Sequence, residues 1–95
     1  MSTILSAQEV TQALHNLPGW SVNGRTIERT FDFANFVEAM GFVNRIAEAA
    51  EAVNHHPDIT INYNKVKLSL TSHDSGGITQ RDLRMAGKSN EIAAT

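Results

Sequence analysis

The chain has 95 residues, 41% of them hydrophobic and 19% charged, with a formal net charge of −2 at pH 7. This ordinary globular mixture predicts a single domain, residues 1–95, built around one core. The acidic balance disfavours nucleic acids and anionic membranes as direct partners. The absence of cysteine excludes disulfides and thiolate metal sites. The N-terminus lacks signal-peptide features and no segment has the ~18 apolar residues of a membrane span, so we expect a cytoplasmic protein.

The N-terminal part of the chain predicts a helix followed by a β-hairpin. Residues 6–9 (Ser-Ala-Gln-Glu) have the form of a capping box, and apolar residues at helical spacing follow until the Pro-Gly pair at 18–19. Residues 20–22 and 25–31 flank the dipeptide at 23–24, Asn-Gly, which favours a tight turn with two positive φ angles. We therefore expect two antiparallel strands joined at this dipeptide.

A long helix is expected from about Asn35 to Val53, with Glu38 as an N-terminal signal and Pro57 preventing continuation. Its apolar residues cover roughly half of the helix circumference, more than the ~100° that a surface helix needs to face its own core. The surplus indicates a subunit contact, expected around three of these residues. They are Phe42, Ile46 and Ala49. The alternative is that the other helices cover this surplus.

The C-terminal part predicts a second hairpin and a third helix. Strands are expected at residues 59–62 and 66–72 around a turn at 63–65, and the alternation along the second strand places His73 on the side away from the core. A capping box at residues 79–82 opens the last helix. The predicted class is α+β, in the order α-β-β-α-β-β-α, with a four-stranded antiparallel sheet and three helices packed on one face.

Three of the four histidines, His55, His56 and His73, fall where the second helix and the fourth strand end. Imidazole titrates near physiological pH, so the group indicates proton transfer or metal binding. The adjacent pair has a plainer interpretation as cations at a helix C-terminus. His15 has no polar neighbour pattern and is expected to be a surface residue.

Glu51 lies four residues before His55, so its carboxylate is expected to orient that imidazole if the last helical turn is regular. The alternative is that Glu51 is a solvated surface charge. Pro57 disfavours the helical conformation at His56, which allows both histidines to line one pocket. A zinc site is a rival interpretation, but consecutive histidines lack the i, i+4 spacing that places two imidazoles on one helix face.

A longer motif contains these residues and has a known counterpart. In order it consists of Glu51, His55, His56, Pro57, Tyr63, His73 and Asp82. This pattern resembles the signature of the pterin-4a-carbinolamine dehydratases at every position. Similarity also extends outside the motif, covering roughly residues 6–92 in all.

The resemblance implies an enzyme that removes water from a 4a-hydroxytetrahydropterin and leaves the quinonoid dihydropterin, in the recycling of the pterin cofactor of aromatic amino acid hydroxylases. It implies no cofactor and no metal, and a homodimer or homotetramer. His55 and His73 would be the general acid and base in either order, and His56 would bind and polarise the pterin. The expected substrate-binding residues are Glu51, Pro57, Ser72, Asp74, Ser75 and Arg81.

Other residues of the motif region are expected to be structural. Asp82 occupies the acidic position of the capping box at the start of the last helix, and Trp20 and Tyr63 are expected to pack near turns. Two further functions stay open: a module that binds the dimerisation segment of a transcription factor, as some members of the family do, and an accessory role in pterin or molybdopterin metabolism.

Overall fold

The computed structural model describes residues 3–95, and its elements follow the order expected from the sequence. The helices are α1 (Ala7–Leu14), α2 (Phe36–Val53) and α3 (Gln80–Ala93). The strands are β1 (Ser21–Asn23), β2 (Thr26–Asp32), β3 (Asp58–Asn62) and β4 (Lys65–Leu70). The predicted α+β class is therefore confirmed.

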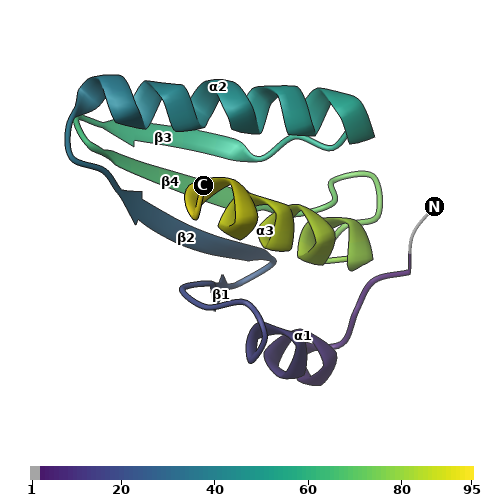
Figure 1. Cartoon of the computed structure of the whole chain (residues 1–95). Helices are drawn as coiled ribbons and strands as arrows, with labels where there is room; N and C mark the ends of the chain where they lie inside the picture. The colour runs from purple at the N-terminus through teal and green to yellow at the C-terminus, as the bar shows by residue number, and fades with distance from the viewer. Residues whose placement is uncertain (1–2) are drawn as a thin grey trace.

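The four strands form one antiparallel sheet in the order β1-β2-β4-β3 (Figure 1). The central strand β4 alternates as expected: Val66, Leu68 and Leu70 are fully buried, whereas Lys67 and Ser69 are partly exposed. Alternation with a period of two gives the sheet one apolar face and one polar face. The apolar face is the one that the helices cover.

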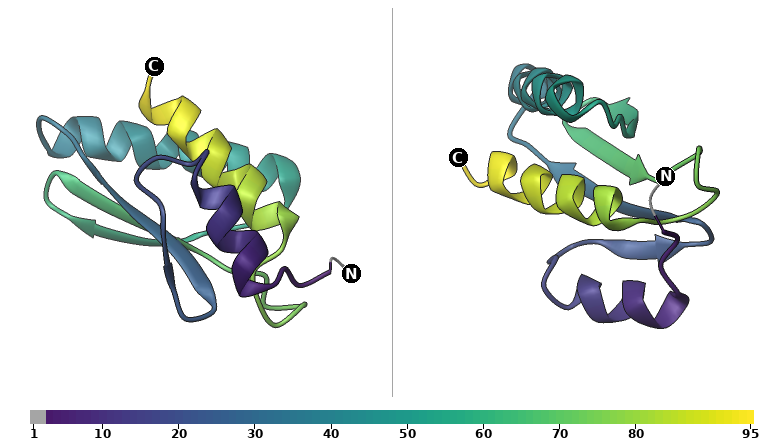
Figure 2. Two further views of the ribbon diagram at one scale, coloured as in Figure 1. Left: turned by 90° about the horizontal axis from the view of Figure 1, so that it is seen from below. Right: turned by 90° about the vertical axis from the view of Figure 1, so that its right-hand side faces the viewer.

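Helices α2 and α3 pack against each other and each contacts β4, while α1 packs against β1 (Figures 1 and 2). A single cluster of buried side chains joins Val10 of α1, Phe42 of α2 and Met85 of α3 to the sheet. Burial of this apolar surface is the main favourable term in the stability of such a domain. Among residues 3–95, no helix has the length and apolar character needed to cross a membrane.

The first hairpin differs from its predicted register by one residue. Asn23 pairs with Thr26, so the two-residue loop consists of Gly24 and Arg25, and of the two only Gly24 has a positive φ, 63°. A turn with glycine at the first central position and one positive φ is of type II′, whereas the expected Asn-Gly turn needs two. The prediction of the hairpin is confirmed, but the prediction of its turn residues is wrong.

The two aromatic residues that were expected to pack near turns behave differently. Trp20 is 6% exposed, and its indole N–H donates to Asn90 Oδ1 at 2.8 Å, as expected of a packing residue. Tyr63 is 64% exposed and occupies the left-handed region, with φ 55°, in the turn between β3 and β4. The packing prediction for Tyr63 is therefore wrong.

Helix α2 begins and ends at asparagines. The side chain of Asn35 accepts a hydrogen bond from the backbone N–H of Glu38 at 2.9 Å, and Asn54 ends the helix in the left-handed conformation with φ 51°. Asparagine is suited to both positions because its short amide can cap a helix and tolerates a positive φ. The left-handed residue turns the chain sharply just before His55, so this helix end sets the direction of both histidines.

The apolar arc of α2 is divided between the protein's own core and solvent. Phe42 and Ile46 are completely buried within the chain, and Ala49 is partly buried. The prediction that these residues form a subunit contact is wrong for Phe42 and Ile46, because the sheet and α3 already cover them. The large apolar residues of α2 that are exposed are instead Phe36, Val37 and Val53, at 48%, 78% and 64%.

Candidate active site

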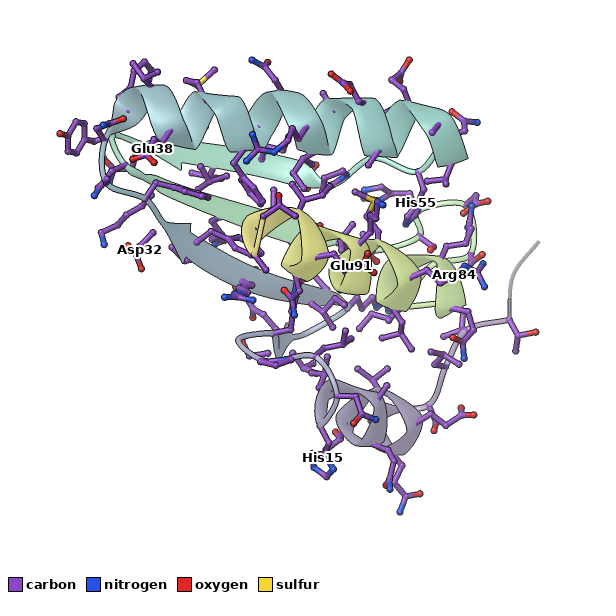
Figure 3. The ribbon with its side chains drawn as sticks, in the orientation of Figure 1. His15, Asp32, Glu38, His55, Arg84 and Glu91 are labelled. Carbon is purple, nitrogen blue, oxygen red and sulfur yellow. The ribbon has the colours of Figure 1, made fainter. Side chains whose placement is uncertain are left out.

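A cavity of about 330 Å³ lies where α2 ends, β4 ends and α3 begins. Seven residues line it: Asn54, His55, His56, Thr71, His73, Asp74 and Arg81. The structure thus brings the three clustered histidines together around one space, although 17 residues separate His56 from His73. The fourth, His15, is exposed near the end of α1, away from this cavity (Figure 3).

His55 is the buried member of the group, at 8% exposure, and it lies between α2 and the start of α3 (Figure 3). Its backbone N–H donates to the carbonyl of Ala50 at 3.1 Å, which continues the hydrogen bonding of α2 past the left-handed Asn54. Its ring Nε2 lies 2.5 Å from Oδ1 of Asp82. Two fixed points, one on the backbone and one on the ring, therefore hold this imidazole in place.

The carboxylate of Asp82 is completely buried, and it both caps the start of α3 and contacts His55. Its Oδ2 accepts hydrogen bonds from the backbone N–H of Thr79 and from the hydroxyl of Ser72, both at 2.9 Å. The first of these closes the predicted capping box of α3. The capping prediction is confirmed, but Asp82 also contacts His55, which the sequence did not indicate.

Glu51 contacts the other histidine. Its carboxylate forms an ion pair and hydrogen bond with Nε2 of His56, and both side chains are more than half exposed. The prediction that Glu51 orients His55 is therefore wrong. The regular helix ends at Val53, so the i, i+4 relation on which the prediction depended does not reach His55.

His73 is exposed and lies just beyond β4, in the direction away from the core that strand parity predicted. Backbone hydrogen bonds close the loop that carries it. They include those from the N–H of Ser72 to the carbonyl of Gly77 at 3.0 Å and from the N–H of Gly76 to the carbonyl of Ser72 at 2.8 Å. Among residues 3–95, no side chain is hydrogen-bonded to its ring. His73 is therefore positioned by its backbone, and no side chain of the described residues fixes the orientation of its ring.

Asp74 and Arg81 form an ion pair at the rim of the cavity, with Nη2 of Arg81 2.5 Å from Oδ1 of Asp74. This hydrogen bond, more than any other contact, holds the pKa of Asp74 below its usual value. The Nε of Arg81 is buried and has no hydrogen-bond partner among the described residues. Arg81 therefore binds Asp74 through Nη2, while its Nε is a buried donor with no partner among these residues.

The remaining predicted substrate-binding residues lie outside the cavity lining. Ser72 is completely buried, and its side chain is linked to the cavity lining through Asp82 and then His55. Pro57 is partly buried, and the hydroxyl of Ser75 is buried without a hydrogen-bond partner among residues 3–95. The sequence interpretation missed two residues that do line the cavity, Asn54 and Thr71. Thr71 shares the strand face of His73, so parity contained a signal for it.

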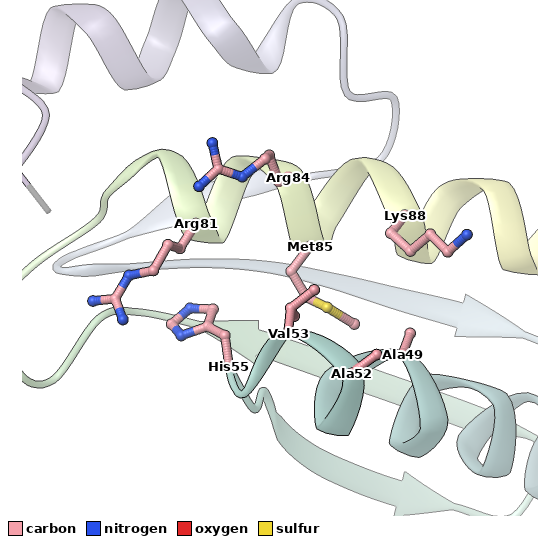
Figure 4. A pocket seen from close by; sticks show the side chains of 8 residues that line it. All are labelled: Ala49, Ala52, Val53, His55, Arg81, Arg84, Met85 and Lys88. Carbon is pink, nitrogen blue, oxygen red and sulfur yellow. The ribbon is translucent and has the colours of Figure 1, made fainter.

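A second cavity of about 460 Å³ adjoins the first between α2 and α3 (Figure 4). Its apolar lining consists of Ala49, Ala52, Val53 and Met85. Arg84 and Lys88 of α3 border it, and His55 and Arg81 line both cavities. His55 therefore stands at the wall between a polar cavity and a largely apolar one.

The donor set is one for proton transfer between imidazoles and a small polar molecule. Histidine is the side chain that most readily gives and takes protons near neutral pH, and the cavity has the size of a small-molecule site. Among the described residues, no group of three or more His, Cys, Asp or Glu is placed to hold a metal ion. The fold and site together define a small α+β domain with a cavity lined by three histidines.

The chain belongs to the pterin 4 alpha carbinolamine dehydratase family, whose sequence pattern matches residues 3–92. Relatives whose names place them in this family include a protein of Koribacter versatilis, 58% identical over 97% of this chain and 98% of its own length. Another, from Thermomicrobium roseum, is 53% identical over 90% of this chain and 91% of its own. The family resemblance of the motif is therefore confirmed.

Solved structures agree with this assignment. A crystal structure from Brucella melitensis, described as a transcriptional coactivator/pterin dehydratase, is similar with a TM-score of 0.91 and 41% identity, covering 96% of this chain and 99% of that one. A pterin dehydratase-like protein described as a RuBisCO assembly factor in the alpha-carboxysome has a TM-score of 0.66 at 17% identity, covering 80% and 88%. The second likeness concerns the fold alone.

Proposed function

We propose that this protein is a cytoplasmic enzyme that removes water from a 4a-hydroxytetrahydropterin and releases the quinonoid dihydropterin. The observation that carries the proposal is the cavity on which His55, His56 and His73 converge, in a chain that belongs to this family. The product is the form from which the cofactor of aromatic amino acid hydroxylases is regenerated. The proposed physiological role is therefore recycling of a tetrahydropterin cofactor.

The chemistry requires one acid and one base. Hydroxide is a poor leaving group at neutral pH, so a proton delivered to the departing oxygen lets the C–O bond break with loss of water. A base removes a proton from a ring N–H as the C=N bond forms, and the two proton transfers balance. We assign these roles to His55 and His73, which border the cavity from the helix end and the strand end.

The other residues of the cavity would bind and orient the pterin. His56 is held by Glu51 at the exposed side, where it can polarise the ring system. The guanidinium of Arg81, together with Asp74, offers donors and an acceptor of the kind that a pterin's amide and amino groups pair with. Ser75 and Pro57, which lie outside the cavity lining, would support the segments that carry His73 and His56.

The direct test is a stopped-flow assay that follows disappearance of the carbinolamine with and without the protein. The carbinolamine also dehydrates spontaneously, so the measured quantity is the rate above this background. A positioned acid or base typically contributes ~10²–10⁴-fold. A rate that does not rise with protein concentration would contradict the proposed activity, whatever the family of the chain.

We also propose that the protein is a homodimer or homotetramer whose contact includes the outer surface of α2. The support is the exposure of Phe36, Val37 and Val53, which a monomer would leave in water. They lie at the two ends of α2, and exposed apolar surface of this kind is a common mark of a protein–protein contact. This surface replaces Phe42 and Ile46, which the fold uses internally.

A further inference from the structure

Four side chains form a buried polar chain beneath the cavity. Asp82, Ser72 and Thr79 are completely buried and His55 is 8% exposed. The hydroxyls of Ser72 and Thr79 are 2.8 Å apart, Ser72 is bonded to Oδ2 of Asp82, and Oδ1 of Asp82 is bonded to Nε2 of His55. Buried polar groups are costly unless each donor meets an acceptor, so the direction of every bond in this chain can be worked out.

The bonds around Oδ2 have only one possible direction. The backbone N–H of Thr79 can only donate, and the hydroxyl of Ser72 gives its single proton to the same oxygen. The hydroxyl of Thr79 accepts from the backbone N–H of Arg81 at 3.2 Å and can therefore donate to Ser72. Both donors point toward Oδ2, so Oδ2 carries no proton. Imidazole is a stronger base than a carboxylate, so the proton between Oδ1 and Nε2 of His55 belongs to the ring, and Asp82 acts as an acceptor only.

An acceptor-only carboxylate requires a donor at its other oxygen, and that donor is Nε2–H of His55. In a neutral imidazole the second nitrogen, Nδ1, then carries the lone pair. Among residues 3–95, Nδ1 has no hydrogen-bond partner and is not among the buried unpaired atoms, so it keeps accessible surface on a ring that lines both cavities.

We infer that Asp82 is a positioning residue that holds His55 in the Nε2–H tautomer, so that Nδ1 is the atom that exchanges a proton with the substrate. This inference rests on the proposed dehydratase function and adds the reacting atom to it. If His55 is the base, Nδ1 takes the ring N–H proton; if it is the acid, Nδ1–H gives its proton to the leaving hydroxide. In both cases Nε2 keeps its proton and donates it in the hydrogen bond to Asp82.

The variant Asp82→Asn tests the inference because the surroundings fix how the new amide must turn. Thr79 N–H and Ser72 O–H both donate, so the amide oxygen takes the place of Oδ2 and keeps the helix cap. The amide NH₂ then faces Nε2 of His55 and can only donate, which moves the ring proton to Nδ1. The analogous change in the serine protease triad produces the wrong histidine tautomer.

The tautomer is read by NMR of the full-length protein labelled with ¹⁵N-histidine, because protonated and unprotonated ring nitrogens resonate far apart. The chain has four histidines, and the signal that disappears in His55→Gln identifies the right one. We expect the Nε2–H tautomer in the wild type and the Nδ1–H tautomer in Asp82→Asn. The catalysed rate, after subtraction of the spontaneous rate, should fall by ~10²–10⁴-fold in the variant. An Nδ1–H wild type, or an unchanged tautomer in the variant, overturns the inference.

Ser72→Ala is the matched control, because it removes one bond to the same carboxylate and leaves its charge and the Thr79 N–H bond in place. We expect this variant to keep the Nε2–H tautomer and to lose far less turnover than Asp82→Asn. Equal losses in both variants would mean that the network acts only through stability. The NMR result does not depend on turnover, so an inactive wild type with the expected tautomer would refute the proposed function and not the positioning.

Discussion

Replacing His55 by alanine should lower both stability and turnover, because this ring is the partner of a buried carboxylate. The substitution leaves Oδ1 of Asp82 without its hydrogen bond in a site with no exposed surface. An unsatisfied buried group costs ~1–3 kcal/mol, even though Oδ2 keeps two donors. In a domain of this size each 1 kcal/mol shifts the melting temperature by ~4–8 °C, so we expect a fall of roughly 4–24 °C.

Two comparison variants separate the structural loss from the chemical loss. His55→Gln places an amide N–H near the former position of Nε2, so it should recover much of the stability without restoring proton transfer. His73→Ala removes an exposed ring and should change stability by less than about 0.5 kcal/mol. Both variants should nevertheless lose turnover by ~10²–10⁴-fold, the contribution of one proton-transfer group.

The assays are thermal unfolding by circular dichroism and single-turnover stopped flow on the same protein preparations. The reasoning would be refuted if His73→Ala destabilised the protein as much as His55→Ala does. It would also be refuted if His55→Gln were stable and fully active, since no amide can replace an imidazole in proton transfer.

Four further predictions concern other parts of the molecule. Arg81→Ala should raise the pKa of Asp74 toward 3.8 in an NMR titration, because the hydrogen bond with Arg81 lowers this pKa. In the wild type the ion pair is therefore complete at neutral pH and is lost only in acid, as the pH falls through the lowered pKa. Ser6→Ala, which opens the capping box of α1 far from the cavity, should cost ~0.5–2 kcal/mol in chemical denaturation with turnover unchanged, and a fall in turnover would contradict the placement of the site. Val37→Lys should shift the mass measured by light scattering toward that of one chain. A wild type that is already monomeric would refute the proposed subunit contact on α2. Turnover should survive treatment with a chelator; stoichiometric zinc whose removal abolishes it would overturn the acid–base assignment.

The order of the elements and their caps was predictable because both depend on neighbouring residues. The capping boxes at Ser6 and Thr79 and the cap at Asn35 are each formed by residues three apart, and all three are present in the structure. The predicted turn of the first hairpin was one residue out of register, because a glycine such as Gly24 suits two turn types equally well. Local chemistry therefore identifies an element more securely than it identifies the pairing between two elements.

The partners of the histidines were not predictable, because they depend on how α2 ends. A regular continuation would place His55 one turn after Glu51, but the left-handed Asn54 redirects the chain. His55 turns toward the start of α3, and His56 is left beside Glu51. The apolar residues of α2 were ambiguous for a related reason. Their arc around the helix does not reveal which part of it the rest of the chain covers and which part stays exposed.

Asp82 shows why one residue can have a local role and a distant role at the same time. The capping box uses only Oδ2, which leaves Oδ1 free to meet a side chain 27 residues away in sequence. A carboxylate that already holds a helix end is rigid, and a rigid acceptor is what an imidazole needs to keep one orientation. Stability at the start of α3 and the orientation of His55 are therefore linked through a single side chain.

The two histidines proposed as acid and base differ in how firmly their rings are held before a substrate binds. The ring of His55 is already held by Asp82, so little side-chain freedom remains for it to lose when a substrate binds. The ring of His73 is exposed and must become ordered during binding. Substrate contacts must supply the free energy for that ordering, whereas Asp82 already provides it for His55. In the proposed mechanism, one proton-transfer group is thus preorganised and the other is positioned by the substrate itself.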